Sequence, residues 1–217
     1  ITPINVPLKA LHRLQGIKWD CGVKVYLGRK VIAESCDELL FTAYGISGPA
    51  ALKVSRRVNE GVLKNEIPEI AIDFFPQLSR SELRDMVVLL LEDKKKKLGF
   101  SLLGILKERV PDVLLSVSGI DPEKKNGSVT EKEIETILSA LKSFRIEPGK
   151  SRGFDEAVAA AGGVSVDEID PATMESKLVK GVYITGELLD IDGDSGGFNL
   201  QFAWSTGAIA GMSQFSE

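Results

Sequence analysis

The sequence predicts an α+β protein of several parts: a small antiparallel β-barrel-like unit with an inserted helical bundle, followed by a strand, a glycine-rich loop and a helix. Three observations predict it. Apolar and polar residues partly alternate in short runs between residues 6 and 42, which is typical of strands. Between residues 79 and 144 the apolar spacing changes to about 3.6, the period of a helix. After residue 153 the chain carries two basic and eleven acidic side chains, which indicates a different surface.

The first part, residues 1–78, is expected to be the β-rich subdomain. Its runs of Val, Ile, Tyr and Leu are broken by glycines. Pro49 follows a glycine-containing turn and suits the first turn of a helix, where its missing N–H costs nothing. The expected elements are strands within residues 6–34, at Glu38–Thr42 and at Ile70–Phe74, and a helix at Pro49–Glu60.

The second part, residues 79–143, is expected to be the helical bundle. Ser79 with Glu82, and Thr130 with Glu133, each form the Ser/Thr-x-x-Glu pattern of a capping box before an apolar run with helical spacing. Two shorter helices are expected between them, at Leu102–Arg109 and Asp112–Val117.

The third part, residues 144–164, is expected to contain strands at Phe144–Glu147 and Ala157–Ala161 that return to the β-rich unit. The bundle would then be an insertion. The last part, residues 165–217, carries the features that point to chemistry.

Composition excludes several classes of protein. A net charge of -4 argues against a surface that binds nucleic acid throughout, although the run Lys94–Lys97 is either a solvated loop or a phosphate contact. One histidine and two cysteines exclude a three-histidine zinc site, a four-cysteine site and a disulfide framework. No apolar run is long enough to span a membrane. We expect a protein of a reducing compartment, the cytoplasm or an organelle, without a resident metal ion.

The last part combines an acidic residue with a glycine-rich loop. Gly181–Thr185 is expected to be a buried strand that ends in Gly186 and Glu187, and the loop Gly193–Asn199 leads into a helix. A carboxylate at a strand end can accept hydrogen bonds from sugar hydroxyls, and an open helix N-terminus attracts an anionic group. Small residues on one face of that helix, Ala203, Gly207 and Gly211, would permit close approach of a strand or a ring. An ordinary glycine turn with a tightly packed helix explains the spacing equally well.

Other constellations are weaker. Asp190, Asp192 and Asp194 match positions one, three and five of an EF-hand loop, but its sixth and twelfth positions are Ser195 and Gln201, so calcium is disfavoured. Ser47 lacks a nucleophile elbow, and the single histidine, His12, lies far from it in sequence. Neither Cys21 nor Cys36 lies in a CxxC motif, so both are expected to be core or half-exposed thiols rather than nucleophiles.

Several motifs together resemble one family. The segments Glu38–Thr42, Tyr44–Pro49, Ala161–Val164 and Thr173–Lys177 resemble its "ELLFTHYGISGP" and "AGGV…TMESK" stretches. Four further segments resemble its C-terminal FAD signature: Gly186–Glu187, Asp192–Gly193, Gly196–Gln201 and Ala203–Gly207. The family is that of the YhiN-like flavoproteins, the BaiN-type NAD(P)/FAD-dependent oxidoreductases, and the motifs occur in its order across nearly the whole chain.

The resemblance implies a cofactor and the residues that bind it. Glu187, after Gly186, would hold the ribitol of FAD, and Gly162, Gly163 and Val164 would lie against the isoalloxazine. Gly196 and Gly197 would lead the backbone of Asn199 and Leu200 to the pyrimidine ring of the flavin. Reduced nicotinamide would be the electron donor and an unsaturated compound, a small molecule or ribosomal RNA, the substrate. The last part would be the closing strand and helix of a Rossmann-like FAD-binding domain.

Two departures from the family pattern matter. Ala43 stands where the family usually has histidine, and no G-x-G-x-x-G motif follows a strand. We therefore expect a fragment of a flavin-dependent oxidoreductase that has half of the FAD site, with the N-terminal FAD-binding segment of the same protein as its partner. The alternative is a substrate- or RNA-recognition module with no activity of its own.

Overall fold

The computed structural model describes residues 1–150 and 152–214. The chain divides into two compact units, which are described separately: Pro3–Arg152 on one side, and Ile1–Thr2 with the chain from Gly153 onward on the other. Among the described helices, none has the length and the apolar character that crossing a membrane requires.

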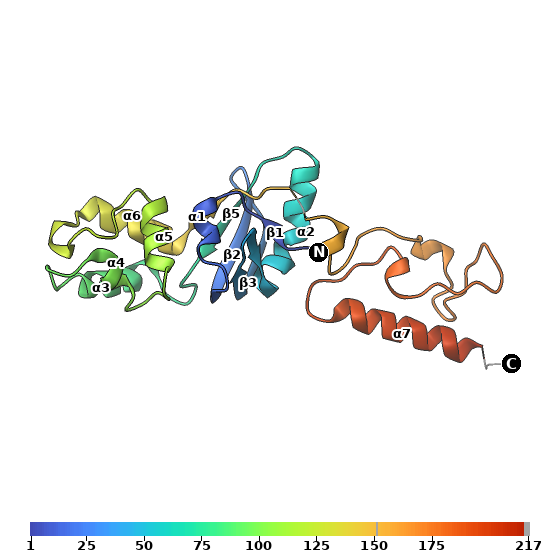
Figure 1. Ribbon diagram of the computed structural model, residues 1–217. Helices are drawn as coiled ribbons and strands as arrows, with labels where there is room; N and C mark the ends of the chain where they lie inside the picture. The colour runs from blue at the N-terminus through green and yellow to red at the C-terminus, as the bar shows by residue number, and fades with distance from the viewer. Residues whose placement is uncertain (151, 215–217) are drawn as a thin grey trace. The chain divides into compact units, whose positions relative to one another are not determined.

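The unit Pro3–Arg152 contains a six-stranded antiparallel sheet with strand order β1-β4-β3-β2-β5-β6. Its centre is the long hairpin of β2 and β3 (Figure 1), in which Lys18 pairs with Leu40. β4 and β1 extend one edge of the sheet, and β5 and β6 extend the other. The strands are β1 (Ile4–Asn5), β2 (Lys18–Leu27), β3 (Lys30–Phe41), β4 (Gly45–Ser47), β5 (Pro68–Asp73) and β6 (Phe144–Ile146). The expected α+β class with an antiparallel β-unit is confirmed.

The two faces of this sheet differ because successive side chains of a strand point in opposite directions. On β2, Val23 and Val25 are fully buried, whereas Lys24 lies on the opposite face. The buried face packs against α2 (Gly48–Leu63), whose Val54 and Val58 have no exposed surface. The helix expected at Pro49–Glu60 is thus confirmed, with Pro49 in its first turn.

The helices α3 to α6 form a group at one end of this sheet (Figure 1). Both expected capping boxes are present: Ser79 precedes α3, Thr130 precedes α6, and Glu82 and Glu133 return their carboxylates to the cap N–H groups. The helices of this unit, with one 3-10 turn, are α1 (Lys9–His12), α2, α3 (Arg80–Leu90), α4 (Leu98–Leu102), α5 (Val110–Val117), η1 (Asn126–Ser128) and α6 (Glu131–Lys142).

The helix expected at Leu102–Arg109 is wrong in position, because α4 ends at Leu102. The helix begins earlier because its first turn is held from outside, where the Gly99 amide donates to the Pro122 carbonyl at 2.9 Å. Beyond it the chain turns at Gly104, where a Cβ would lie 2.6 Å from Cδ2 of Leu90. The apolar spacing of this segment therefore reflects burial in turns rather than a second helix.

One core joins the sheet to the bundle. Trp19 on β2 contacts Phe74 edge to face at 5.9 Å between ring centroids, and Phe74 contacts Phe144 in the same way at 6.2 Å. Lys142 at the end of α6 donates to the carbonyls of Phe75 and Leu78, both at 2.8 Å. The sheet and bundle therefore share packing and hydrogen bonds within one unit.

In the other unit, the described residues form one long helix, α7 (Phe198–Ser213), three short 3-10 turns and irregular chain. The turns are η2 (Phe154–Glu156), η3 (Val166–Glu168) and η4 (Gly186–Leu188). The strands expected at Ala157–Ala161 and at Gly181–Thr185 are not formed. A strand requires a neighbour along its length, and in the second segment only Tyr183 forms a bridge, to Glu175. Of the two strands expected in residues 144–164, β6 alone is present.

Candidate functional site

The predicted glycines 162 and 163 lie on a backbone ledge made of two segments. The Val164 amide donates to the Leu188 carbonyl at 2.8 Å, and the Asp190 amide donates to the Val164 carbonyl at 2.9 Å. These bonds place residues 162–164 parallel to residues 188–190. We call these two segments the glycine ledge.

Both glycines of the ledge are required, for different reasons. A Cβ on Gly163 would lie 2.5 Å from the Leu188 carbonyl oxygen, so no side chain fits between the two segments. Gly162 has φ +99°, which disfavours other residues, yet a Cβ there would meet no atom within 4 Å. The ledge is therefore closed on the side of its partner segment and open beside Gly162.

Glu187 lies next to the ledge, in η4. Its Oε1 accepts a hydrogen bond from the Ala160 amide at 2.6 Å, while the side chain remains exposed. The carboxylate is thus held beside the chain that leads into Gly162, with the rest of its acceptor capacity available for a ligand.

The N-terminus of α7 has no capping side chain. Gly196 and Gly197 have φ of +140° and +91°, and Gly197 is the cap residue. The Asn199 side chain is used elsewhere: its Oδ1 accepts from the Gly193 amide at 2.8 Å and its Nδ2 donates to the Gly193 carbonyl at 3.0 Å. Asn199 therefore fixes the preceding loop, and any contact from Asn199 or Leu200 to a ligand would come from their backbone.

Helix α7 is attached to the ledge through Gly186. The Gly186 amide donates to Oγ1 of Thr206 at 3.0 Å, and a Cβ on Gly186 would lie 3.2 Å from Cβ of Ala203. Ala203 is five residues after Phe198, about 8 Å along the helix axis at 1.5 Å per residue. All nine predicted cofactor-binding residues thus lie in one unit: on the ledge, beside it in η4, or at the start of α7.

Two residues of this arrangement were not predicted, Ala160 and Thr206. Ala160 acts through its backbone, which no side-chain pattern reveals. The small residues of the helix did indicate a close approach, which the structure places at Ala203 and Gly186. A Cβ on Gly207 or Gly211 would meet nothing within 4 Å among the described residues.

Three features of this arrangement can interact with a ligand. An exposed carboxylate accepts hydrogen bonds from hydroxyl groups, the open glycine leaves space against the backbone, and a helix N-terminus favours negative charge. A metal site has no support in the described chain, which contains no group of three His, Cys, Asp or Glu residues able to hold an ion.

The residues weighed as nucleophiles from the sequence, and the single histidine, all lie in the unit Pro3–Arg152. Burial raises the pKa of Cys21 to about 12, with smaller contributions from Cys36, Asp73 and Asp20, so this thiol is protonated at neutral pH. Cys36 is exposed. Nε2 of His12 lies 2.8 Å from the Val6 carbonyl oxygen, and Ser47 is the cap residue of α2.

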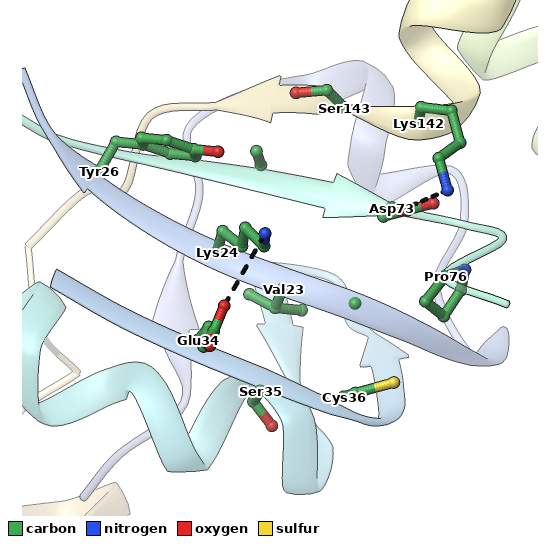
Figure 2. A pocket seen from close by; sticks show the side chains of 12 residues that line it. Val23, Lys24, Tyr26, Glu34, Ser35, Cys36, Asp73, Pro76, Lys142 and Ser143 are labelled. Atoms are coloured by element: carbon green, nitrogen blue, oxygen red, sulfur yellow. Dashed lines mark ion pairs between the residues drawn. The ribbon is translucent and has the colours of Figure 1, made fainter. Parts of the chain in front are cut away.

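The polar face of the sheet, in the other unit, has a hollow of about 600 Å³ (Figure 2). Its ionic groups are paired: Lys24 lies 3.8 Å from Glu34, and Lys142 lies 2.7 Å from Asp73. None of the nine predicted residues lines this hollow. It is the water-facing side of a half-buried sheet, and the paired charges do not identify a ligand. The lining residues are Gly22, Val23, Lys24, Tyr26, Glu34, Ser35, Cys36, Ala71, Asp73, Pro76, Lys142 and Ser143.

Comparison with known proteins adds a family and several relatives. Residues 2–159 match the family described as "HI0933-like protein barrel and H2TH domain". The chain is 34% identical over 220 residues to the 3-dehydro-bile acid delta(4,6)-reductase of Clostridium scindens, across 97% of this chain and 53% of the relative.

Two further relatives are named ribosomal RNA dihydrouridine synthase. The protein of Escherichia coli is 30% identical over 172 residues, which cover 78% of this chain and 40% of the relative. The protein of Haemophilus influenzae is 27% identical over 205 residues, which cover 94% and 48%. The chain spans about half the length of the curated relatives it matches.

Proposed function

Because the chain belongs to the family of HI0933-like proteins with a barrel and an H2TH domain, as its motifs predicted, we propose that the whole protein is a flavin-dependent oxidoreductase. It would use FAD to pass electrons from reduced nicotinamide to an unsaturated substrate. The observation that carries the proposal is the position of Glu187, exposed and oriented by the Ala160 amide beside the glycine ledge. The name of the reductase relative supports the same class of reaction.

Each predicted residue has a role in this proposal that agrees with its surroundings. Glu187 would accept hydrogen bonds from the ribityl hydroxyls of FAD, and the open side of Gly162 would take the flat ring system. The backbone N–H groups at Asn199 and Leu200 would face the pyrimidine edge, where the helix dipole stabilises negative charge. When bound, FAD would supply the two-electron carrier between nicotinamide and substrate.

The second half of the FAD site would come from a dinucleotide-binding fold of the same protein. The surface of α7 supports this. Among the described residues of the helix, Thr206 alone is buried, while Phe198, Trp204 and Met212 are each about two-thirds exposed. A helix that is apolar on all sides is typical of the core of a larger protein. We therefore propose that α7 packs against the FAD-binding segment. That segment would also bind the pyrophosphate of FAD, because the glycines of this sequence do not have the G-x-G-x-x-G spacing of a pyrophosphate-binding loop.

A second candidate function concerns the substrate. Two relatives are named as enzymes that act on ribosomal RNA, and they match 78% and 94% of this chain. On this proposal the unit Pro3–Arg152 recognises RNA, whereas the name of the reductase relative supports a small molecule similar to a bile acid as the substrate. Both classes are consistent with transfer of electrons to an unsaturated ring.

The experiment that tests the flavin proposal measures FAD in the whole protein. We expect a yellow protein that copurifies with FAD, and we expect Glu187→Gln to weaken FAD binding about tenfold to a hundredfold, because a hydrogen bond to a charged group contributes about 1.5–3 kcal/mol. Glu168→Gln is the matched control, since Glu168 is an exposed carboxylate of the same unit. A colourless whole protein that cannot be reconstituted with FAD would contradict the proposal.

A further inference from the structure

Six lysines are brought together by two loops of the helical bundle. Residues 92–98 and 121–127 run antiparallel, and the backbones of Lys97 and Lys125 form a β-bridge. The Asn126 amide donates to the Lys96 carbonyl at 2.9 Å, and the Leu98 amide donates to the Lys124 carbonyl at 2.8 Å. We call these two segments the lysine ribbon. It contains the run that the sequence left open as a solvated loop or a phosphate contact.

The side chain of Asn126, which is 3% exposed, anchors the ribbon by hydrogen bonds. Its Nδ2 donates to the Asp93 carbonyl and to Oγ of Ser101, both at 2.9 Å. A Cβ on Gly127 would lie 3.1 Å from Cβ of Lys94, so the two segments are in close contact. The lysines are therefore presented by a fixed backbone rather than by an unanchored loop.

The positive charge of the ribbon is only partly neutralised. Lys97 pairs with Glu123 and Lys124 with Glu133, and Lys96 is 3.8 Å from Asp93. The ammonium of Lys94 donates to a neutral carbonyl, that of Leu91. The side chains of Lys95 and Lys125 have no hydrogen-bond or ion-pair partner among the described residues. Six lysines against Glu92, Asp93, Asp121, Glu123 and the paired Glu133 leave one excess positive charge.

An exposed aromatic ring lies beside one lysine of the ribbon, Lys96. Phe100, on α4, is 62% exposed, and it lines a hollow of about 350 Å³ together with Lys96. Leu103 in the same hollow is 44% exposed. An aromatic face beside ammonium groups is the combination that binds single-stranded nucleic acid, because the ring stacks on an unpaired base while the charges contact the phosphates.

We propose that the lysine ribbon and Phe100 form a binding surface for an unpaired stretch of RNA. Lys94, Lys95 and Lys125 contact successive phosphates, and Phe100 stacks on a base seated in the hollow next to Lys96. Duplex RNA binds less well, because its bases are already stacked on one another. This inference rests on the second candidate function and deepens it by naming the residues of contact.

The test measures binding of a fluorescent single-stranded RNA to the protein at two salt concentrations, without added cofactor or substrate. We expect Lys95→Gln with Lys125→Gln to weaken binding roughly tenfold or more near 0.1 M salt. The slope of log K against log salt is expected to fall by about 1.4, because each phosphate contact of a single strand contributes about 0.7. Lys30→Gln with Lys64→Gln is the matched control, since both lysines are exposed in the same unit outside the ribbon.

Phe100→Ala separates stacking from charge. It is expected to weaken RNA binding about fivefold to a hundredfold but to leave binding of heparin, a polyanion without bases, unchanged. Phe100→Tyr keeps an aromatic ring and is expected to retain RNA affinity.

Three outcomes overturn the inference. RNA binding that none of the ribbon variants weakens would place the contact elsewhere and leave the second candidate function standing, whereas no RNA binding at all would remove both. The third is a different role for the exposed ring: a protein contact if Phe100→Ala dissociates a dimer, or a membrane contact if the protein prefers phosphatidylserine vesicles. The FAD measurement on Glu187→Gln is independent of all three.

Discussion

The substitution Gly163→Ala is expected to disrupt the glycine ledge. The added Cβ would lie 2.5 Å from the Leu188 carbonyl oxygen and 2.9 Å from the Asp190 amide nitrogen. To reach even 3.0 Å from the oxygen, the two segments must separate by about 0.5 Å, the difference between 3.0 and 2.5 Å. That movement weakens the two hydrogen bonds between Val164 and the partner segment.

The magnitude follows from these two bonds and from the backbone. Two hydrogen bonds at about 0.5–1.5 kcal/mol each give about 1–3 kcal/mol, and an unfavourable φ adds about 1–3 kcal/mol. Gly162→Ala is the matched control, because it has the backbone strain without the clash. The two variants should therefore differ by about 1–3 kcal/mol in the free energy of opening the ledge.

Amide hydrogen exchange at Val164 and Asp190 measures this difference directly. We expect both amides to exchange about fivefold to 150-fold faster in Gly163→Ala than in Gly162→Ala. On the flavin proposal, FAD affinity falls in parallel in the whole protein. Equal exchange rates in the two variants would refute the packing argument for Gly163.

Three further predictions concern the unit Pro3–Arg152. Thr130→Ala removes the cap of α6 and should lower the free energy of unfolding by about 1 kcal/mol, measured by urea denaturation, while Thr130→Ser should change it little. The hydrogen bond from Lys124, with further bonds from Thr130, lowers the pKa of Glu133 to about 2. Because its pKa is lower in the folded state, the ionised Glu133 stabilises the folded protein at pH values above its ordinary pKa of 4.5. This stabilisation should disappear as the pH falls from about 4.5 to 2. In acid titrations followed by circular dichroism, Glu133→Gln should remove this pH dependence of stability. A thiol reagent at neutral pH should label Cys36 and spare Cys21 until denaturant is added, because Cys21 is buried; rapid labelling of both in the native protein would contradict the described burial.

The parts of the fold that could be predicted are those in which a few adjacent residues determine the geometry. The capping box of Ser79 and Glu82 needs only four residues, and the Pro49 helix is set by its first turn. The helix placed at Leu102–Arg109 failed because Pro122, which is 23 residues after Gly99, accepts the hydrogen bond of the Gly99 amide. Such a contact has no local signal.

The candidate site was predictable to a similar extent. Resemblance to a family identified Glu187 and the glycines, and the structure places these residues in one unit. The geometry that orients Glu187 was not predictable, because its partner is the backbone amide of Ala160. The strand expected at Gly181–Thr185 has suitable composition, but composition does not supply the neighbouring strand that a sheet requires.

The two ends of the unit Pro3–Arg152 lie side by side. The Gly149 amide donates to the Asn5 carbonyl at 2.7 Å, and in the other unit the Val158 amide donates to the Ile1 carbonyl at 2.8 Å. A segment with adjacent ends can be inserted into a loop of a host fold, or replaced there, without altering the path of the host chain. This unit can therefore be exchanged as a whole, with no change in the path of the chain on either side of it.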